Sequence, residues 1–217
     1  MEFDDLVKLI RERRSIRVWE DKPVPESLLV KALQLAVWAP NGGNQQNWHF
    51  YVILNRETLN RIADAVQASA DQVASWPEAK EHGDVASGWR ERAGFFRSAP
   101  AAIVVATSQY QSLPDQVMAA REKTDPQAAQ MRQWRNTADS RIQSASAATA
   151  YLVLVLHALG LGAVWMTGPM QAKGEIEKIL HVPPSMDVIT FIPVGYPAES
   201  PAPRARRPFS EVCEVLR

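Results

Sequence analysis

The stretch AAIVVATS, residues 101–108, is a short, mostly apolar run that directly follows a proline. A run of this length with β-branched residues predicts a buried strand. Outward from it, the runs WHFYVIL at 48–54, GAVWMTG at 162–168 and DVITFIPVGYP at 187–197 combine aromatic and β-branched residues. They predict three further strands. The four runs together predict a central sheet.

Helical patterns separate these strands. The expected helices run from residue 4 or 5 to about 13–15, from 25 to just before 40, and at about 56–69, 142–159 and 173–180. The first is expected to bury Leu6, Leu9 and Ile10, which are spaced for one helix face. Strands and helices alternate without internal repeats, which predicts an α+β or α/β sandwich whose helices cover a mixed sheet.

The length of 217 residues suits one hydrophobic core, so residues 1–217 are expected to form a single domain. Two polar stretches, about 70–96 and 110–141, interrupt the strand pattern. We expect them to be excursions from the core, or a lid, that border an active site. The first of them contains glycines and Pro77 and is expected to be irregular.

Charge and composition exclude several classes of protein. Lys and Arg together number 24, as do Asp and Glu, so no overall field attracts nucleic acid or an anionic membrane. One cysteine, Cys213, and four scattered histidines give no metal-ligand pattern and no internal disulfide. The uncharged segment 142–172 has the length of a membrane span, but polar residues dilute it and GLG at 160–162 breaks it. No signal-peptide core is present at the start, so a cytoplasmic protein without a metal is expected.

Arginines gather at both ends of the chain. Arg13, Arg14 and Arg17 surround Ser15 at the end of the first expected helix, and RARR follows at 204–207. Guanidinium groups bind phosphate in a bidentate fork, so two such clusters in a neutral protein suggest an anionic ligand. Either cluster alone is more often a solvated surface. GxGxxG and GxxxxGK[ST] are both missing from the sequence, so neither a dinucleotide fingerprint nor a P-loop supplies the phosphate site.

Four separated stretches resemble the nitroreductase family of FMN enzymes, in family order and spacing. They are RRSIRVW at 13–19, PVPESLLVKALQLAVWAPNGGNQQNWHFYVI directly after it from residue 23, GLGAVWMTG at 160–168, and IPVGYPAE with PRARRP at 192–208. The resemblance implies an α+β nitroreductase-like sandwich that binds FMN as a dimer. RRSIR alone would be poor evidence; the four matches together carry the inference.

The resemblance also implies roles for single residues. It implies that Arg13 and Ser15 contact the phosphate or ribityl chain of FMN, that Arg17 lies near the pyrimidine edge of the ring, and that Arg204 and Arg206 bind the phosphate. Arg14 matches a less specific position. Arg92 is a weak candidate for the ribityl contact that many relatives have in mid-chain.

Further roles concern the ring and the dimer. The resemblance implies that Thr167 and Gly168 present N–H groups to the ring while Trp165 and Met166 pack beneath it; strand core is an equally good explanation for the last two. It implies that Asn41, Gly42 and Asn44 reach the FMN that the other subunit binds, although NGGN is on its own only a polar turn. The uncharged helix expected at 142–159 suits a dimer core, and equally the central helix of a monomer.

Two positions depart from the family pattern. Asn47 stands where a proline is usual, and Tyr151 replaces an amide residue in the long helix. Neither removes a charge from the expected phosphate site, so they bear on the ring environment and on the choice of substrate. Phe95, Phe96, Met131 and Trp134 are candidates for the wall of the substrate pocket.

The family reaction that the resemblance implies is ping-pong transfer of hydride from NADH or NADPH through FMN to a small electron-poor acceptor, such as a nitroaromatic or a quinone. The flavin carries the hydride, so no protein residue is expected to act as a catalytic residue. Two alternatives stay open. One keeps the flavin but carries out enone reduction, reductive dehalogenation or flavin fragmentation. The other is a non-catalytic module whose arginines bind RNA, and it predicts binding that weakens steeply with salt.

Overall fold

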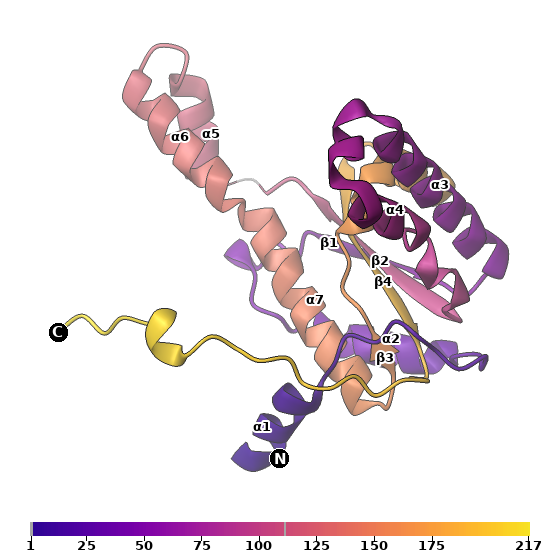
Figure 1. Ribbon diagram of the computed structural model, residues 1–217. Helices are drawn as coiled ribbons and strands as arrows, with labels where there is room; N and C mark the ends of the chain where they lie inside the picture. Colours follow the sequence, from indigo (N-terminus) through magenta and orange to yellow (C-terminus); the bar gives the residue numbers. More distant parts are fainter. Residues whose placement is uncertain (1, 111) are drawn as a thin grey trace.

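A four-stranded sheet lies at the centre of the molecule in the computed structural model, which describes residues 2–110 and 112–217 (Figure 1). Its strands are β1 (Trp48–Ile53), β2 (Ala101–Ser108), β3 (Gly162–Ala163) and β4 (Met186–Gly195), in the order β1-β2-β4-β3. All three strand pairs are antiparallel. The stretch 101–108 forms β2, which is buried along its whole length up to Ser108. The prediction of a buried strand there is confirmed.

The third strand is shorter than its sequence predicts. Of residues 162–168 only Gly162 and Ala163 form a ladder with β4, and Met166 adds an isolated bridge to Phe191. The chain then turns into a 3₁₀ helix that begins at Gly168. The only parallel pairing among the described residues is an isolated bridge from Ser15 to Ala163, outside the named strands. The four-stranded sheet itself is antiparallel, whereas the sequence predicts a mixed sheet.

Helices cover both faces of the sheet (Figure 1). The α-helices are α1 (Phe3–Glu12), α2 (Glu26–Ala36), α3 (Arg56–Ser75), α4 (Gly83–Glu91), α5 (Leu113–Arg121), α6 (Pro126–Ala138), α7 (Ser140–Ala158) and α8 (Lys173–Ile179). The 3₁₀ helices are η1 (Gly42–Asn44), η2 (Pro77–His82), η3 (Phe95–Ser98), η4 (Gly168–Ala172) and η5 (Phe209–Glu211).

Alternate residues of β2 point into two separate cores, as the two-residue period of a strand requires. Ala102, Val104 and Ala106 pack with residues of α3 and α8. Ala101, Ile103 and Val105 pack with residues of α2 and α7 on the opposite face. The predicted α+β fold, with a central sheet flanked by helices, is therefore confirmed.

The stretch that the sequence predicts to be irregular, up to about residue 96, is largely helical. α3 continues to Ser75 instead of ending near residue 69, and Pro77 then opens η2. α4 folds back on α3, where Arg90 pairs with Asp71 at 2.6 Å and Gln67 donates to the carbonyl oxygen of Arg90. These contacts between helices lie outside what a local pattern can indicate.

α5 and α6 form a hairpin that projects from the start of α7, away from the sheet (Figure 1). Asp115 in α5 pairs with Arg135 in α6. Leu113, Val117 and Trp134 on this hairpin are more than half exposed, so its apolar side chains have little cover within one chain.

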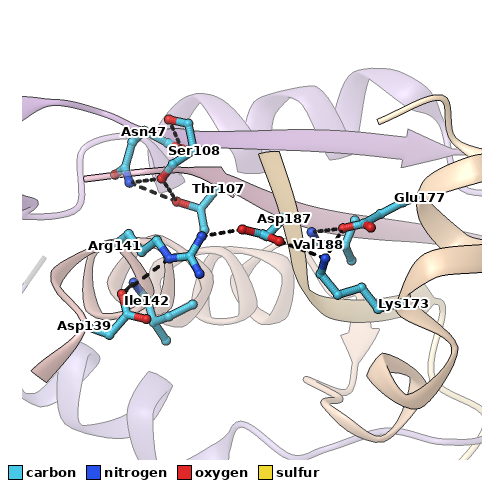
Figure 2. A network of polar contacts seen from close by, with 10 residues as sticks. All are labelled: Asn47, Thr107, Ser108, Asp139, Arg141, Ile142, Lys173, Glu177, Asp187 and Val188. Atoms are coloured by element: carbon cyan, nitrogen blue, oxygen red, sulfur yellow. Dashed lines mark hydrogen bonds and ion pairs between the residues drawn. The ribbon is translucent and has the colours of Figure 1, made fainter. Parts of the chain in front are cut away.

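A polar network joins the start of α7 to β4 and α8 (Figure 2). Asp187 in β4 accepts from Arg141 of α7 and pairs with Lys173 of α8 at 2.8 Å; Lys173 also pairs with Glu177 at 2.7 Å. The hydrogen bonds from Lys173 and Arg141 hold the pKa of Asp187 below its usual value. Beside this network the Asn47 amide donates to Thr107 and to the carbonyl of Ser108, both at 2.9 Å, and so ties the start of β1 to the end of β2.

Two apolar helices are incompletely covered. Leu6 and Leu9 of α1 are only half-buried and Ile10 is 54% exposed, so the prediction that this helix buries all three in the core is wrong for the single chain. α7 leaves Tyr151 44% exposed and Ala158 exposed on its outer side. None of the described helices, α7 with its 19 residues included, is long and apolar enough to cross a membrane.

Candidate functional site

Both ends of the chain contribute to one basic cavity of about 690 Å³, which we call the arginine cleft. Ile10, Arg11, Arg13, Arg14, Ser15 and Arg17 line it from the N-terminal side, and Pro201, Ala202, Pro203, Arg204 and Arg206 line it from the C-terminal side. The structure thus brings together every arginine that the sequence proposes for the phosphate, together with Ser15. Arg11 joins them without having been proposed.

Backbone hydrogen bonds bring the two ends together. The segment after α1 runs beside β3, where Ile16 N–H donates to Ala163 at 3.1 Å. It then runs beside the segment after β4, where Glu20 N–H donates to Tyr196 and Ala198 N–H donates to Val18. This pairing places residues 201–206 next to the end of α1.

Close packing at Gly162 sets the position of the arginine segment. The side chain of Ile16 fills the space where a Cβ on Gly162 would stand, with its nearest atoms at 2.7–2.9 Å from that point. The indole N–H of Trp19 donates to the Gly162 carbonyl at 2.9 Å. A glycine is therefore required for this approach, which connects the RRSIRVW and GLGAVWMTG stretches physically.

Glu199 fixes the backbone at Arg17, on the N-terminal side of the arginine cleft. Its carboxylate accepts hydrogen bonds from the backbone N–H groups of Arg17 and of Val18, the latter at 3.1 Å. The guanidinium of Arg17 makes one local hydrogen bond, from Nη1 to the Ser15 carbonyl oxygen at 3.4 Å. Sequence reasoning assigned no role to Glu199, although it is the last residue of the matching stretch IPVGYPAE.

The arginines of the cleft lack acidic partners within the part of the chain that the structure describes. Arg13, Arg14, Arg17, Arg204 and Arg206 form no ion pair there, and the Nε of Arg14 is buried without a hydrogen bond. Burial, then the charges of Arg14 and Arg206, lower the pKa of Arg13. Burial, then Arg13, lower the pKa of His157 at the end of α7. A cluster of like charges with an orphaned donor fits a multiply charged anion such as a phosphate monoester.

A second cavity, of about 420 Å³, adjoins the arginine cleft, and we call it the Phe95 cavity. Arg17 lines both cavities. The other lining residues of the Phe95 cavity are Val66, Trp89, Arg92, Ala93, Phe95, Met166, Gly168, Pro169 and Gln171. Its walls are mainly apolar and it borders a cluster of cations, which suits a flat aromatic group that carries a phosphate.

Of the four residues expected to contact the ring, two line this cavity and two lie outside its lining. Met166 and Gly168 line the Phe95 cavity, whereas Trp165 and Thr167 are exposed outside its lining. Neighbouring residues of an extended segment point to opposite sides, which explains why Met166 and Trp165 separate.

Asn41, Gly42 and Asn44 line neither cavity. The Gly42 N–H donates to Ser144 Oγ at 3.2 Å, near the start of α7, whereas Arg13 influences His157 near the end of that helix. Thirteen residues of α-helix separate these points, about 20 Å at the usual rise. Within one chain the NGGN turn thus lies far from the arginines.

The four residues proposed from the sequence for the wall of the substrate pocket lie in different parts of the molecule. Phe95 lines the cavity and stacks on Trp19, with ring centroids 6.2 Å apart. Phe96 is fully buried against Phe191 and belongs to the core. Met131 and Trp134 lie on the projecting hairpin, outside both cavities. Trp89, Pro169 and Gln171 were not identified from the sequence, because they reach the Phe95 cavity through the positions of helices α4 and η4 in the fold.

Comparison with known proteins agrees with this geometry. The model of the nitroreductase family matches residues 10–196. A "Putative NADH dehydrogenase/NAD(P)H nitroreductase" of Methanothermobacter thermautotrophicus is 31% identical over 204 residues, which is 92% of this chain and 81% of the relative. A BluB-like flavoprotein of Clostridium difficile has a similar structure, with a TM-score of 0.85 and 25% identity over all of both chains. An FMN-dependent nitroreductase of the same species has a TM-score of 0.61 and 25% identity, over 92% of this chain and 91% of that one.

Proposed function

Because the chain belongs to the nitroreductase family and is an NAD(P)H-dependent flavin oxidoreductase with FMN as its cofactor, we propose that it passes hydride from NADH or NADPH to a small electron-poor acceptor. Nitroaromatics and quinones are the proposed acceptors. We further propose that one domain, residues 1–217, carries the activity, and that stretches 70–96 and 110–141 border the site.

The observation that carries the proposal is the position of Arg17 at the junction of the two cavities. We assign the arginine cleft to the phosphate and the Phe95 cavity to the ring of FMN. Arg13, Ser15, Arg204 and Arg206 would hold the phosphate, with Arg14 at its border. Met166 and Gly168 would contact the ring.

FMN supplies a two-electron carrier when it is bound. The protein then has to hold it, tune its charge and limit the access of water. The guanidinium of Arg17 would stabilise negative charge on the ring after reduction, because Arg17 lines both cavities and Glu199 holds its backbone N–H at their junction. The apolar walls of the Phe95 cavity would leave one face for the nicotinamide and the acceptor in turn.

A homodimer completes the proposal. Asn41, Gly42 and Asn44 are too far from the cleft of their own chain to contribute to it, as the length of α7 indicates. The uncharged outer side of α7 around Tyr151 is partly exposed and suits contact with a second copy. In such a pair each NGGN turn would serve the partner's site.

The spectrum of the freshly purified protein tests the cofactor. Bands near ~450 nm and ~370 nm are expected from flavin chemistry. A phosphate-dependent site also predicts that FMN binds far more tightly than riboflavin, which has the same ring without the phosphate. A colourless protein that binds neither compound would refute the proposal.

Steady-state kinetics with NADH, NADPH and a panel of acceptors tests the reaction. Parallel double-reciprocal lines are expected, because donor and acceptor use the same place in turn. Background rates with nitroaromatics and quinones, combined with turnover of a halogenated aromatic or an enone, would instead favour the other flavin reactions. Tight RNA binding that falls steeply with salt would favour the non-catalytic alternative. A cytoplasmic location is also proposed. It rests on Cys213, a single exposed cysteine that cannot form a disulfide within the chain, as is usual in a reducing compartment.

A further inference from the structure

An apolar groove of about 420 Å³ lies where α4 folds back on the end of α3, and we call it the tryptophan groove. Val73, Trp76, Ala79, Val85 and Trp89 supply apolar walls to it. Glu78 and His82 are the ionisable residues among its lining side chains. Trp76 is 50% exposed and Val85 is 77% exposed, so apolar side chains here face solvent at a cost that burial by a ligand would remove.

The groove adjoins the proposed ring site through one shared side chain. Trp89 lines both the tryptophan groove and the Phe95 cavity, so the two spaces meet at this residue. A molecule that sits against the ring in the Phe95 cavity therefore meets Trp89 at its edge, and any substituent that passes this side chain enters an apolar channel.

We propose that the tryptophan groove binds an apolar tail of the electron acceptor, and that the acceptor is a quinone with a hydrocarbon side chain. This inference rests on the proposed function, since it places the quinone head in the Phe95 cavity. The head is flat and takes up two electrons and two protons, with hydride from NAD(P)H and a proton from solvent converting two carbonyl groups to hydroxyls. The tail requires apolar walls and no specific polar partner, which the groove supplies.

A pair of acceptors with one head tests the proposal. The holoenzyme is assayed with a benzoquinone that has no side chain and with the same quinone carrying a decyl chain. The decyl compound is expected to have a KM at least about tenfold lower at similar kcat, because burial of several methylenes is strongly favourable. Equal KM values for the two quinones would overturn the inference.

Substitution in the groove provides the sharper test. Val85→Glu should raise the KM of the decyl quinone about tenfold, since it places a charge among apolar walls, and leave the short quinone unchanged. Val85 is 77% exposed, so the change should not disturb folding. Val85→Ile should keep the advantage of the tail. Val215→Glu, at a valine of similar exposure (71%) outside the groove, is the matched control. An equal effect of Val85→Glu on both quinones would overturn the proposal.

Calorimetric titration of the oxidised holoenzyme, without NAD(P)H, separates this inference from the proposed function. If neither quinone is reduced, the proposed function fails with quinones. The ratio of the two Kd values still shows whether the groove binds the decyl chain. A lower Kd for the decyl compound that Val85→Glu abolishes supports the groove, whereas equal Kd values exclude it.

Discussion

Arg17 connects the two cavities, so its side chain is expected to influence both the binding and the reduction of FMN. Arg17→Ala should raise the Kd for FMN about tenfold or more, as for the loss of a charged hydrogen bond. It should also make the midpoint potential more negative, because the reduced ring loses a neighbouring positive charge. Flavin fluorescence titration and potentiometry measure the two effects.

Arg14→Ala serves as the comparison within the cluster. The Nη1 of Arg14 already donates to the carbonyl oxygens of Arg11 at 2.6 Å and Arg13 at 2.9 Å, so only its unpartnered Nε side is available to a ligand. A clearly smaller change in Kd and no change in potential are expected. Equal effects of the two substitutions would show that the roles within the cluster are wrongly assigned.

Gly162 is expected to tolerate no side chain. Gly162→Ala places a Cβ within 2.9 Å of Ile16, which should lower the free energy of unfolding by about 1–3 kcal/mol and weaken FMN binding through a shift of the arginine segment. Gly174→Ala is the matched control, since a Cβ there has nothing within 4 Å and should stabilise α8 by about 0.5 kcal/mol. Thermal unfolding with and without FMN measures both; equal melting temperatures would contradict the packing argument.

Residue types at the site are predictable from the sequence, whereas side-chain directions are only partly so. Arginines in short clusters signal an anion whatever the fold, and the structure places them in one cleft. The early end of the β3 ladder depends on its pairing with β4, and the burial of Phe96 depends on Phe191 from a distant strand. Both follow from long-range contacts that no local pattern records.

At the scale of elements, the ion pair between Asp115 of α5 and Arg135 of α6 is expected to stabilise their hairpin in a pH-dependent way. Hydrogen bonds from Arg135 lower the pKa of Asp115 to about 2, and Asp115 also accepts from Ser112 at the start of α5. A carboxyl with a lowered pKa stabilises the fold fully above its unfolded value of about 4 and loses this effect as the pH falls through about 2. Asp115→Asn should therefore cost about 1 kcal/mol at pH 7, and less as the pH falls below 4.

Hydrogen exchange of the α5 amides, measured at several pH values, checks this expectation. Arg135→Gln should produce a similar loss at pH 7, and the double variant should lose little more than either single one, because each removes the same interaction. Additive losses would show that the two side chains act separately.

The strands were easier to predict than the helices between them. The runs at 48–54 and 101–108 form β1 and β2 almost residue for residue, because apolar runs of this length with β-branched residues are typical of buried strands. α4 was missed because Gly83 and Gly88 weaken its helical pattern, while its position depends on the pairing of Arg90 with Asp71. Tertiary contacts compensate there for poor local propensity.

At the scale of the whole molecule, one chain leaves apolar side chains exposed on several surfaces. α1 exposes Ile10, α7 exposes Tyr151, and from Ala202 to Arg217 every residue is exposed as the C-terminal segment runs away from the sheet (Figure 1). Exposure of apolar side chains such as Ile10 and Tyr151 is costly in water. The sequence indicates that the long helix is buried, and a second copy of the chain would supply the missing cover.

Tyr151→Arg is expected to convert the proposed homodimer to a monomer, because two-fold symmetry would place the new charge and its copy in one apolar contact. Leu54→Arg, at a residue of similar exposure (41% against 44%) at the end of β1, should leave the dimer intact. Sedimentation measures the mass of each. If the NGGN turn serves the partner's site, the monomer should also bind FMN at least about tenfold more weakly, although its arginine cleft is unchanged. A dimeric Tyr151→Arg variant would place the interface elsewhere, and a monomer with full affinity for FMN would show that each chain binds the cofactor alone.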